Sequence, residues 1–217
     1  MKLFERGAPL IRLIDNIGKL TVLNLLFVLC SIPVVTLPAS LTALYGCAIR
    51  LLRGGDADSG EFFRIFKRDF KKATLVGLIL AVVGALLYAD YWMIEREVLP
   101  LPAAFTYVLY ALIFLLAATA TYVFPMIAQF ENTCARYLKN SLLFALRSLP
   151  STLIMMVLNL MPVMILLLNV DVFLRVIVIW VVLGWGLTAF INARLFLRVF
   201  RPYFTEIPEM SEEEESD

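Results

Sequence analysis

The side chains that could carry out chemistry in this sequence are few, and the most versatile type is absent. There is no histidine among the 217 residues, which excludes histidine metal sites, Ser-His-Asp or Cys-His triads and imidazole proton relays. Cys30, Cys47 and Cys134 lack CxxC spacing and lie in apolar sequence, so we expect reduced, buried thiols. No glycine-rich phosphate loop and no pair of acids within an apolar run is present. We therefore expect a protein that is not an enzyme and has no metal and no cofactor.

The composition of the chain favours a lipid environment. Hydrophobic residues make up 61% of the sequence and charged residues 17%, whereas a soluble domain has about half apolar and about a quarter charged residues. Seven acids and no base lie in residues 206–217, which we expect to form a disordered, solvating tail. Without this tail the chain has 19 bases and 11 acids. Because the bases flank apolar runs, they indicate an anionic membrane surface and no nucleic acid.

Four apolar stretches are long enough to cross a bilayer core of about 30 Å as helices. They lie at about residues 73–94, 103–124, 150–170 and 174–193. Backbone amides in lipid must be paired within their own segment, which requires helices. The sequence therefore predicts a single integral membrane domain over residues 1–205, with an all-α, polytopic helix-bundle fold.

The distribution of bases predicts the orientation of this bundle. Seven bases lie in residues 50–72, three in residues 136–147 and three in residues 194–201. The opposite loops carry only Arg96 and Arg175. By the positive-inside rule, the basic loops and the C-terminus are predicted to be cytoplasmic.

The stretch from Leu20 to Ile49 does not fit a simple crossing. It contains 30 residues without a charge, is interrupted by two prolines, and has bases on both flanks. We favour a fifth transmembrane helix over residues 20–37, because 18 apolar residues can span a slightly thinned bilayer. The alternative is a re-entrant hairpin of two half-length helices, near residues 20–32 and 39–49, which gives four crossings plus the hairpin.

An amphipathic helix is predicted before the stretch at 73–94. Asp58 or Ser59 can cap it, and its aromatic side chains fall within an arc of about 100° while the bases lie opposite. The pattern is typical of a helix that lies in the membrane interface with its aromatic face toward lipid. Residues 132–149 have a weaker version. These helices are membrane-surface connectors or, alternatively, helices that dock a partner. The aromatic positions are Phe62, Phe63, Phe66 and Phe70.

Polar residues within the apolar stretches are sparse. They are expected mainly to form hydrogen bonds between helices, worth about 0.6 kcal/mol each on average; a substrate path is the alternative. A weak repeat with an offset of about 72–75 residues, in which Arg64 and Lys67 align with Arg136 and Lys139, is typical of some transporters. The polar residues are Asn24, Ser31, Thr36, Thr119, Thr121, Asn159 and Asn192.

Several segments of the sequence resemble the YesL family of bacterial membrane proteins. The segments are NLLFVLCSIPVVTLPA (24–39), TALY (42–45) and FFRIFKRDFKK (62–72), and the later FPMIAQFEN (124–132) and LKNSL (138–142) are similar to that family's second half. The resemblance implies a multi-pass protein of the bacterial cytoplasmic (inner) membrane with unknown biochemical activity. It also implies an association with carbohydrate-uptake ABC transporters and glycan-degrading enzymes, because members are often found alongside these.

These observations lead to three hypotheses about function. We favour an accessory or regulatory partner of carbohydrate uptake, which contacts the lipid bilayer and carbohydrate ABC transporter subunits. The alternatives are an autonomous small-solute transporter and a structural or lipid-organising membrane protein. The candidate functional surface combines the proline-interrupted stretch with the aromatic and basic helix, and consists of Asn24, Pro33, Thr36, Pro38, Tyr45, Phe63, Phe66 and Lys67.

Overall fold

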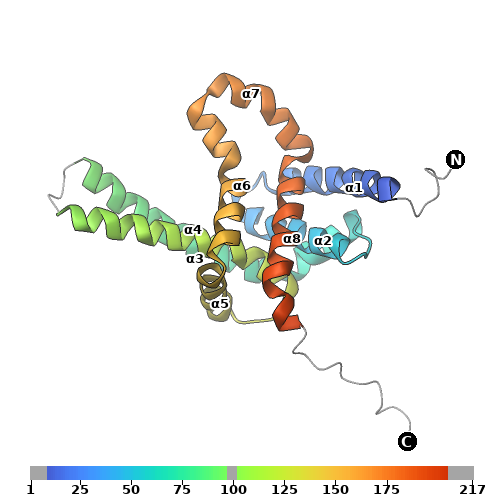
Figure 1. Ribbon diagram of the computed structural model, residues 1–217, viewed down its shortest axis with the longest axis horizontal. Coiled ribbons are helices and arrows are strands. Elements are labelled where there is room, and N and C mark those ends of the chain that lie inside the picture. The colour runs from blue at the N-terminus through green and yellow to red at the C-terminus, as the bar shows by residue number, and fades with distance from the viewer. Residues whose placement is uncertain (1–8, 97–101, 205–217) are drawn as a thin grey trace, which may run out of the picture.

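The computed structural model describes residues 9–96 and 102–204, and all regular secondary structure in these two ranges is helical (Figure 1). The predicted all-α class is thus confirmed for the described chain, while the predicted acidic tail at 206–217 lies outside it. The helices are α1 (Pro9–Cys30), the 3₁₀ turn η2 (Val34–Thr36), α2 (Leu37–Leu52), α3 (Ser59–Glu95), α4 (Ala103–Gln129), α5 (Cys134–Arg147), α6 (Leu149–Leu168), α7 (Val170–Ile179), the π-helical turn η3 (Trp180–Gly184) and α8 (Trp185–Phe204).

Five helical segments of the described chain are long and apolar enough to cross a membrane. Their length and composition are those of a multi-pass membrane protein. Four of them contain or overlap the four apolar stretches predicted from the sequence; the fifth is formed by η2 and α2. The segments are Val34–Leu52, Ser59–Glu95, Ala104–Gln129, Leu149–Leu168 and Val170–Phe200.

The predicted single helix over residues 20–37 is wrong, because the chain breaks there into two helices, α1 and α2, joined by a turn. Helix α1 ends at Cys30, three residues before Pro33, which disfavours helical geometry in the residue before it and has no N–H to donate. The chain then turns and α2 runs back. An ion pair of 2.7 Å between Lys19 Nζ and Asp56 Oδ1 links the middle of α1 to the loop that follows α2 in this α1–α2 hairpin. The hydrogen bond and charge of Lys19 lower the pKa of Asp56.

The tip of the α1–α2 hairpin reaches only part of the way along α3. Pro38, at the start of α2, packs so closely on Gly77 of α3 that a Cβ atom at Gly77 would lie 2.3 Å from Pro38 Cγ. Gly77 is five residues beyond Lys72, the last base of the interfacial stretch, and 18 residues before Glu95. At about 1.5 Å per residue, the contact lies about 8 Å past that base and about 27 Å from the far end of α3. The hairpin tip therefore lies nearer the basic end of α3 than its far end.

The turn at the hairpin tip pairs much of its own backbone. Thr36 Oγ1 donates to the carbonyl oxygens of Cys30 (2.5 Å) and Pro33 (2.6 Å), and Ser31 and Ser40 share a hydrogen bond of 2.8 Å between their hydroxyl groups. Pro33 has no N–H that needs a partner. These pairings lower the cost of placing non-helical backbone among apolar side chains.

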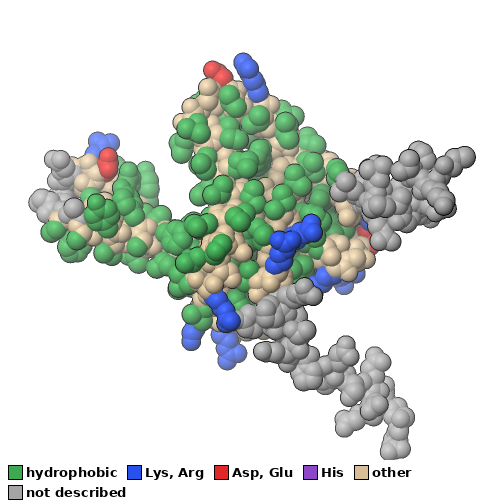
Figure 2. All heavy atoms as spheres, viewed as in Figure 1, with side chains coloured by type: hydrophobic (Ala, Val, Ile, Leu, Met, Phe, Trp, Pro, Cys, Tyr) green, Lys and Arg blue, Asp and Glu red, His purple; other side chains and the backbone are tan. Residues whose placement is uncertain are grey.

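Two helical hairpins diverge from a common base. In Figure 1, α3 and α4 extend to the left and α6 and α7 extend upward before α8 returns. We call them the α3–α4 arm and the α6–α8 arm. Hydrophobic side chains cover both arms and a deep notch separates them (Figure 2). Bases lie near α5 and on the middle part of α8, and the arm tips carry few charges.

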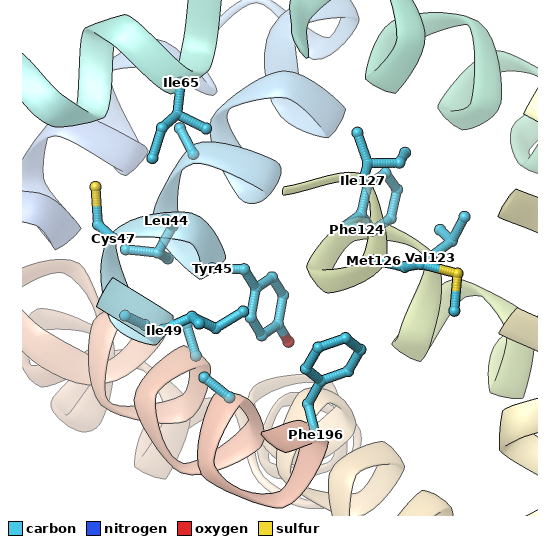
Figure 3. Close-up of a cluster of buried hydrophobic side chains, with 14 of the residues drawn as sticks. Leu44, Tyr45, Cys47, Ile49, Ile65, Val123, Phe124, Met126, Ile127 and Phe196 are labelled. Atoms are coloured by element: carbon cyan, nitrogen blue, oxygen red, sulfur yellow. The ribbon is translucent and has the colours of Figure 1, made fainter. Parts of the chain in front are cut away.

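Helix α2 forms the centre of the core. Eleven of its 16 residues are buried, and it is apolar on all sides, as expected for a helix enclosed by others. Many of its side chains are small, which lets the surrounding helices approach closely. Figure 3 shows Tyr45 of α2 pointing toward Phe196 of α8 and the α4 residues Phe124 and Ile127, with Leu44 on the other side of it.

Helix α3 begins where the sequence predicts, because Asp58 Oδ1 accepts a hydrogen bond of 2.8 Å from the Glu61 amide. The predicted aromatic face is only partly right. Phe62 is completely buried in the protein core, and Phe63 is exposed. The buried face of α3 therefore starts with Phe62 and contacts neighbouring helices, so this part of the helix does not lie with its whole aromatic face on lipid. Asp69 is buried on the same face and pairs with Arg68.

Candidate functional site

A cavity at the base of the two arms has a volume of about 270 Å³. Four helices wall it: α2, α4, α6 and α8. Its walls are mostly apolar, and several are small, including Ala117, Ala120 and Ala189. We call it the inter-arm cleft. Its lining residues are Leu41, Tyr45, Ala117, Ala120, Thr121, Phe124, Met156, Asn159, Leu160, Trp185, Thr188 and Ala189.

A second, apolar groove of about 580 Å³ lies against the other side of α4. It runs between the hairpin tip and helices α3 and α4, and shares Ala117, Ala120 and Phe124 with the inter-arm cleft. Pro38 contributes to its wall, and Thr74 Oγ1 is buried there without a hydrogen-bond partner among the described residues. The small residues of α4 therefore separate two neighbouring apolar spaces.

A chain of three polar side chains connects the elements around the cleft. Asn192 Nδ2 of α8 donates to Asn159 Oδ1 of α6 (2.7 Å) and to the Tyr45 hydroxyl of α2 (3.2 Å). Asn192 is completely buried, and its Oδ1 has no hydrogen-bond partner among the described residues. Since a buried amide in an apolar surrounding strongly prefers to be paired, the network fixes α2, α6 and α8 relative to one another.

This network predicts unequal effects of two substitutions. Asn159→Leu removes the shorter bond and leaves the Asn192 amide with a single long one, so we expect the free energy of unfolding to fall by about 1–2 kcal/mol. Tyr45→Phe removes only the 3.2 Å bond, and we expect a loss below about 1 kcal/mol. Unfolding of the purified variants in mild detergent measures both. Equal losses would contradict this ranking of the two bonds.

Asn24 of α1 holds the π-helical turn η3. Its Nδ2 donates to the carbonyl oxygens of Trp180 (3.2 Å) and Val181 (2.6 Å), and its Oδ1 accepts from the Gly186 amide at 2.7 Å. A π turn widens the helix and displaces backbone groups from their usual partners. The completely buried Asn24 amide supplies replacements. Gly186 permits the contact, because a Cβ atom there would lie 2.8 Å from the Leu20 carbonyl oxygen.

The structure does not bring the eight predicted site residues into one place. Tyr45 lines the inter-arm cleft and Pro38 lines the neighbouring groove. Asn24 lies under η3, and Pro33 and Thr36 lie in the hairpin turn. Along α3, Phe63 and Lys67 are exposed and Phe66 is half-buried between Phe62 and Phe70. Only Tyr45 therefore lines the inter-arm cleft, and only Pro38 lines the neighbouring groove.

Sequence reasoning missed most of the cleft. Trp185 and Thr188 were not singled out, and Asn192 was named only among the polar residues expected mainly to form hydrogen bonds between helices, with a substrate path as the alternative. Asn192 is the only amide side chain in α8, and this isolated polar residue was the one feature of the sequence that could have indicated the cleft. Across the described ranges, 9–96 and 102–204, no group of three or more cysteine or acidic side chains is placed to hold a metal ion. The cleft can thus bind apolar groups with a few hydrogen bonds at its base.

Comparisons with known proteins place the chain near uncharacterised relatives. A family model described as "Protein of unknown function, DUF624" matches residues 20–91. The "Uncharacterized protein YteU" of Bacillus subtilis (strain 168) is 27% identical over 156 residues, which are 69% of this chain and 69% of that protein. No solved structure matches the chain. The region that the family model matches covers the second half of α1, all of α2 and most of α3. Neither description names an activity.

Proposed function

We propose that this protein is an accessory or regulatory subunit of carbohydrate uptake in the bacterial cytoplasmic membrane, and that the inter-arm cleft receives a transmembrane helix of the transporter. It has no enzymatic activity in this proposal. The observation that carries it is the cleft itself, an apolar space with small-residue walls between two arms that are covered by hydrophobic side chains (Figure 2). The carbohydrate partner rests on the resemblance to the YesL family.

The walls of the cleft suit a helix. Ala117 and Thr121 are four residues apart on α4 and line it together, which is the small-xxx-small spacing that lets two helix backbones approach closely in a membrane. On the facing arm, Leu160 is 46% exposed, so an apolar side chain is available for packing. Tyr45 and Asn159 at the base offer the few polar atoms that fix the orientation of a bound helix.

The orientation of the protein follows from the same proposal. The bases near Arg50, on α5 and at the end of α8 lie on the cytoplasmic side together with the C-terminus. Phe63 and Lys67 are exposed on α3 at that side, where they contact cytoplasmic parts of the transporter. The bilayer covers the outer faces of both arms.

Autonomous solute transport is less well supported, because the polar side chains that could line a path are engaged with the protein. Asn24 bonds three backbone groups of the last helical segment. Thr36 bonds two carbonyl oxygens within the hairpin turn. Asn159 accepts from Asn192. A packing role explains each of these bonds.

Site-specific photo-crosslinking in living cells tests the proposal. A photoreactive residue at Leu160 or Phe63 is expected to give an adduct with a membrane subunit of a carbohydrate transporter, identified by mass spectrometry. The same residue at Leu86, which is 61% exposed on the outer part of α3, is expected to give lipid adducts only. Lipid adducts at all three positions would contradict the proposal and favour a structural or lipid-organising protein.

A variant that fills the inter-arm cleft tests whether the crosslinked helix binds there. Ala120→Trp places a large side chain in the cleft, so we expect the adduct at Leu160 to fall at least about fivefold while that at Phe63 falls less. Ala85→Trp adds the same side chain at an exposed position of α3 and is expected to leave both adducts unchanged. Adducts that persist in Ala120→Trp would show that the helix binds elsewhere.

A further inference from the structure

A separate cavity of about 490 Å³ lies at the basic end of the helices. Four arginines from α2, the loop after it and α3 surround it, and its floor is formed by the small or apolar residues of α2, α3 and α4. We call it the arginine pocket. Its arginines are Arg50, Arg53, Arg64 and Arg68, its acid is Glu61, and its other lining residues are Gly46, Ile49, Gly55, Ile65, Ala128 and Gln129.

Positive charge exceeds negative charge in this pocket. Arg50 and Arg64 both pair with Glu61, Arg50 at 2.9 Å, so one carboxylate serves two guanidinium groups. Arg68 pairs with Asp69 at 2.6 Å. The Glu61 side chain is only 12% exposed, whereas those of Arg50 and Arg64 are 47% and 65% exposed. Each guanidinium has five N–H donors, so the two arginines have donors beyond those that Glu61 accepts.

The loop between α2 and α3 holds Arg50 in place. Gly54 has a φ of +81°, a conformation that favours glycine, and the following Gly55 amide donates to the Arg50 carbonyl oxygen at 3.1 Å. A Cβ atom at Gly55 would lie 3.0 Å from Arg50 Cγ. The loop therefore folds closely over the last turn of α2, and the arginine side chain extends toward Glu61.

The floor of the pocket is apolar and tightly packed. Gly46 lies so close to Ile65 that a Cβ atom at Gly46 would be 2.8 Å from Ile65 Cδ1. Ile49 and Ala128 complete this surface. A ligand in the pocket thus meets guanidinium groups at the rim and hydrocarbon beneath them.

We propose that the arginine pocket binds the phosphate group of an anionic ligand, presented either by a phospholipid headgroup or by a free phosphate ester. Arginine forks match phosphate oxygens in pairs, with charge-assisted hydrogen bonds. Basic pockets between membrane helices bind anionic headgroups for the same reason, and an apolar floor accommodates the glycerol and upper acyl carbons. This site is independent of the inter-arm cleft and of the function proposed above.

Native mass spectrometry of the full-length protein, purified in a neutral detergent, tests the site. The probes are phosphatidylglycerol, diacylglycerol with the same chains but no phosphate, and glycerol phosphate without chains. We expect phosphatidylglycerol to bind, diacylglycerol to fail, and Arg64→Gln to weaken binding about tenfold, as the loss of a charge-assisted hydrogen bond implies. Arg64→Lys keeps the charge and is expected to lose less. Arg136→Gln, on exposed α5 surface, removes one base outside the pocket and is the matched control.

The outcomes separate the two sources of phosphate. Binding of phosphatidylglycerol alone identifies a lipid headgroup, and binding of glycerol phosphate with the same dependence on Arg64 identifies a soluble ester; either supports the site. Equal loss in Arg64→Gln and Arg136→Gln, or binding of diacylglycerol as strong as that of phosphatidylglycerol, would overturn it. Arg50→Lys serves as a second variant. Gel filtration and circular dichroism confirm that each variant is folded before its binding is compared.

Discussion

Replacing Asn24 by leucine is expected to lower the free energy of unfolding by about 3 kcal/mol, because it leaves three backbone groups of the last helical segment without their partner. These groups are the Trp180 and Val181 carbonyl oxygens and the Gly186 amide. Leucine has the same number of side-chain heavy atoms and the same branching as asparagine, so the loss comes from unpaired polar atoms more than from a cavity. Unfolding in mixed detergent, followed by tryptophan fluorescence, gives the measurement.

The control for this variant is Asn140→Leu on α5. Asn140 is half-buried at the surface of the bundle, so the same change of side chain is expected to cost less than about 1 kcal/mol. A similar loss in both variants, or no loss in Asn24→Leu, would show that η3 is held by its own packing. Trp180 begins η3 and Trp185 directly follows it, so their emission reports on this region.

A comparable loss, about 3 kcal/mol, is expected for Gly77→Ala. The new Cβ atom would lie 2.3 Å from Pro38 Cγ and 2.7 Å from Pro38 Cβ, and the rigid proline ring cannot rotate away, so the hairpin tip has to move. Thermal unfolding of the purified protein measures the loss. Protease sensitivity of the turn at residues 31–36 reports the displacement of the tip.

Glycine-to-alanine substitution at Gly84 is the control on the same helix. A Cβ atom there meets only Leu116 Cδ2 at 3.5 Å, an ordinary contact, and alanine favours the helix by up to about 1 kcal/mol. The double variant Gly77→Ala with Pro38→Gly removes both clashing atoms and is expected to recover much of the loss. Without this recovery, the contact between Pro38 and Gly77 would not be the cause.

The parts of the fold that depend only on the composition of one segment could be predicted from the sequence. Long uncharged stretches predicted the helices that became α3, α4 and α6, since a single segment must pair its own backbone in lipid. The cap at Asp58 was also predicted from its residue type and position. For residues 20–49, hydropathy is the same for a crossing and for a hairpin. The deciding contacts, Lys19 with Asp56 and Pro38 with Gly77, join residues far apart in the chain.

The residues of the inter-arm cleft and of the arginine pocket were harder to predict, because their role depends on partners in other helices. Tyr45 was selected through a family resemblance, but its partners lie on α6 and α8, more than a hundred residues away. Arg50 and Arg64 were counted among the bases that orient the protein, and no local pattern shows that both meet Glu61. Asn24 was considered for a functional path because it is polar in apolar sequence. Its bonds to η3 give it a structural role.

The bond between Asn24 and η3 also has a consequence for biosynthesis. The ribosome delivers Asn24 to the membrane long before Trp180 and Gly186, because more than 150 residues separate them. Until α8 inserts, the Asn24 amide has no partner, and the surface of α1 at Leu20 lacks the close contact with Gly186. Helix α1 therefore completes its contacts only when η3 and α8 have inserted. A chain that is released before then leaves the Asn24 amide unpaired, and membrane quality control can recognise this polar group.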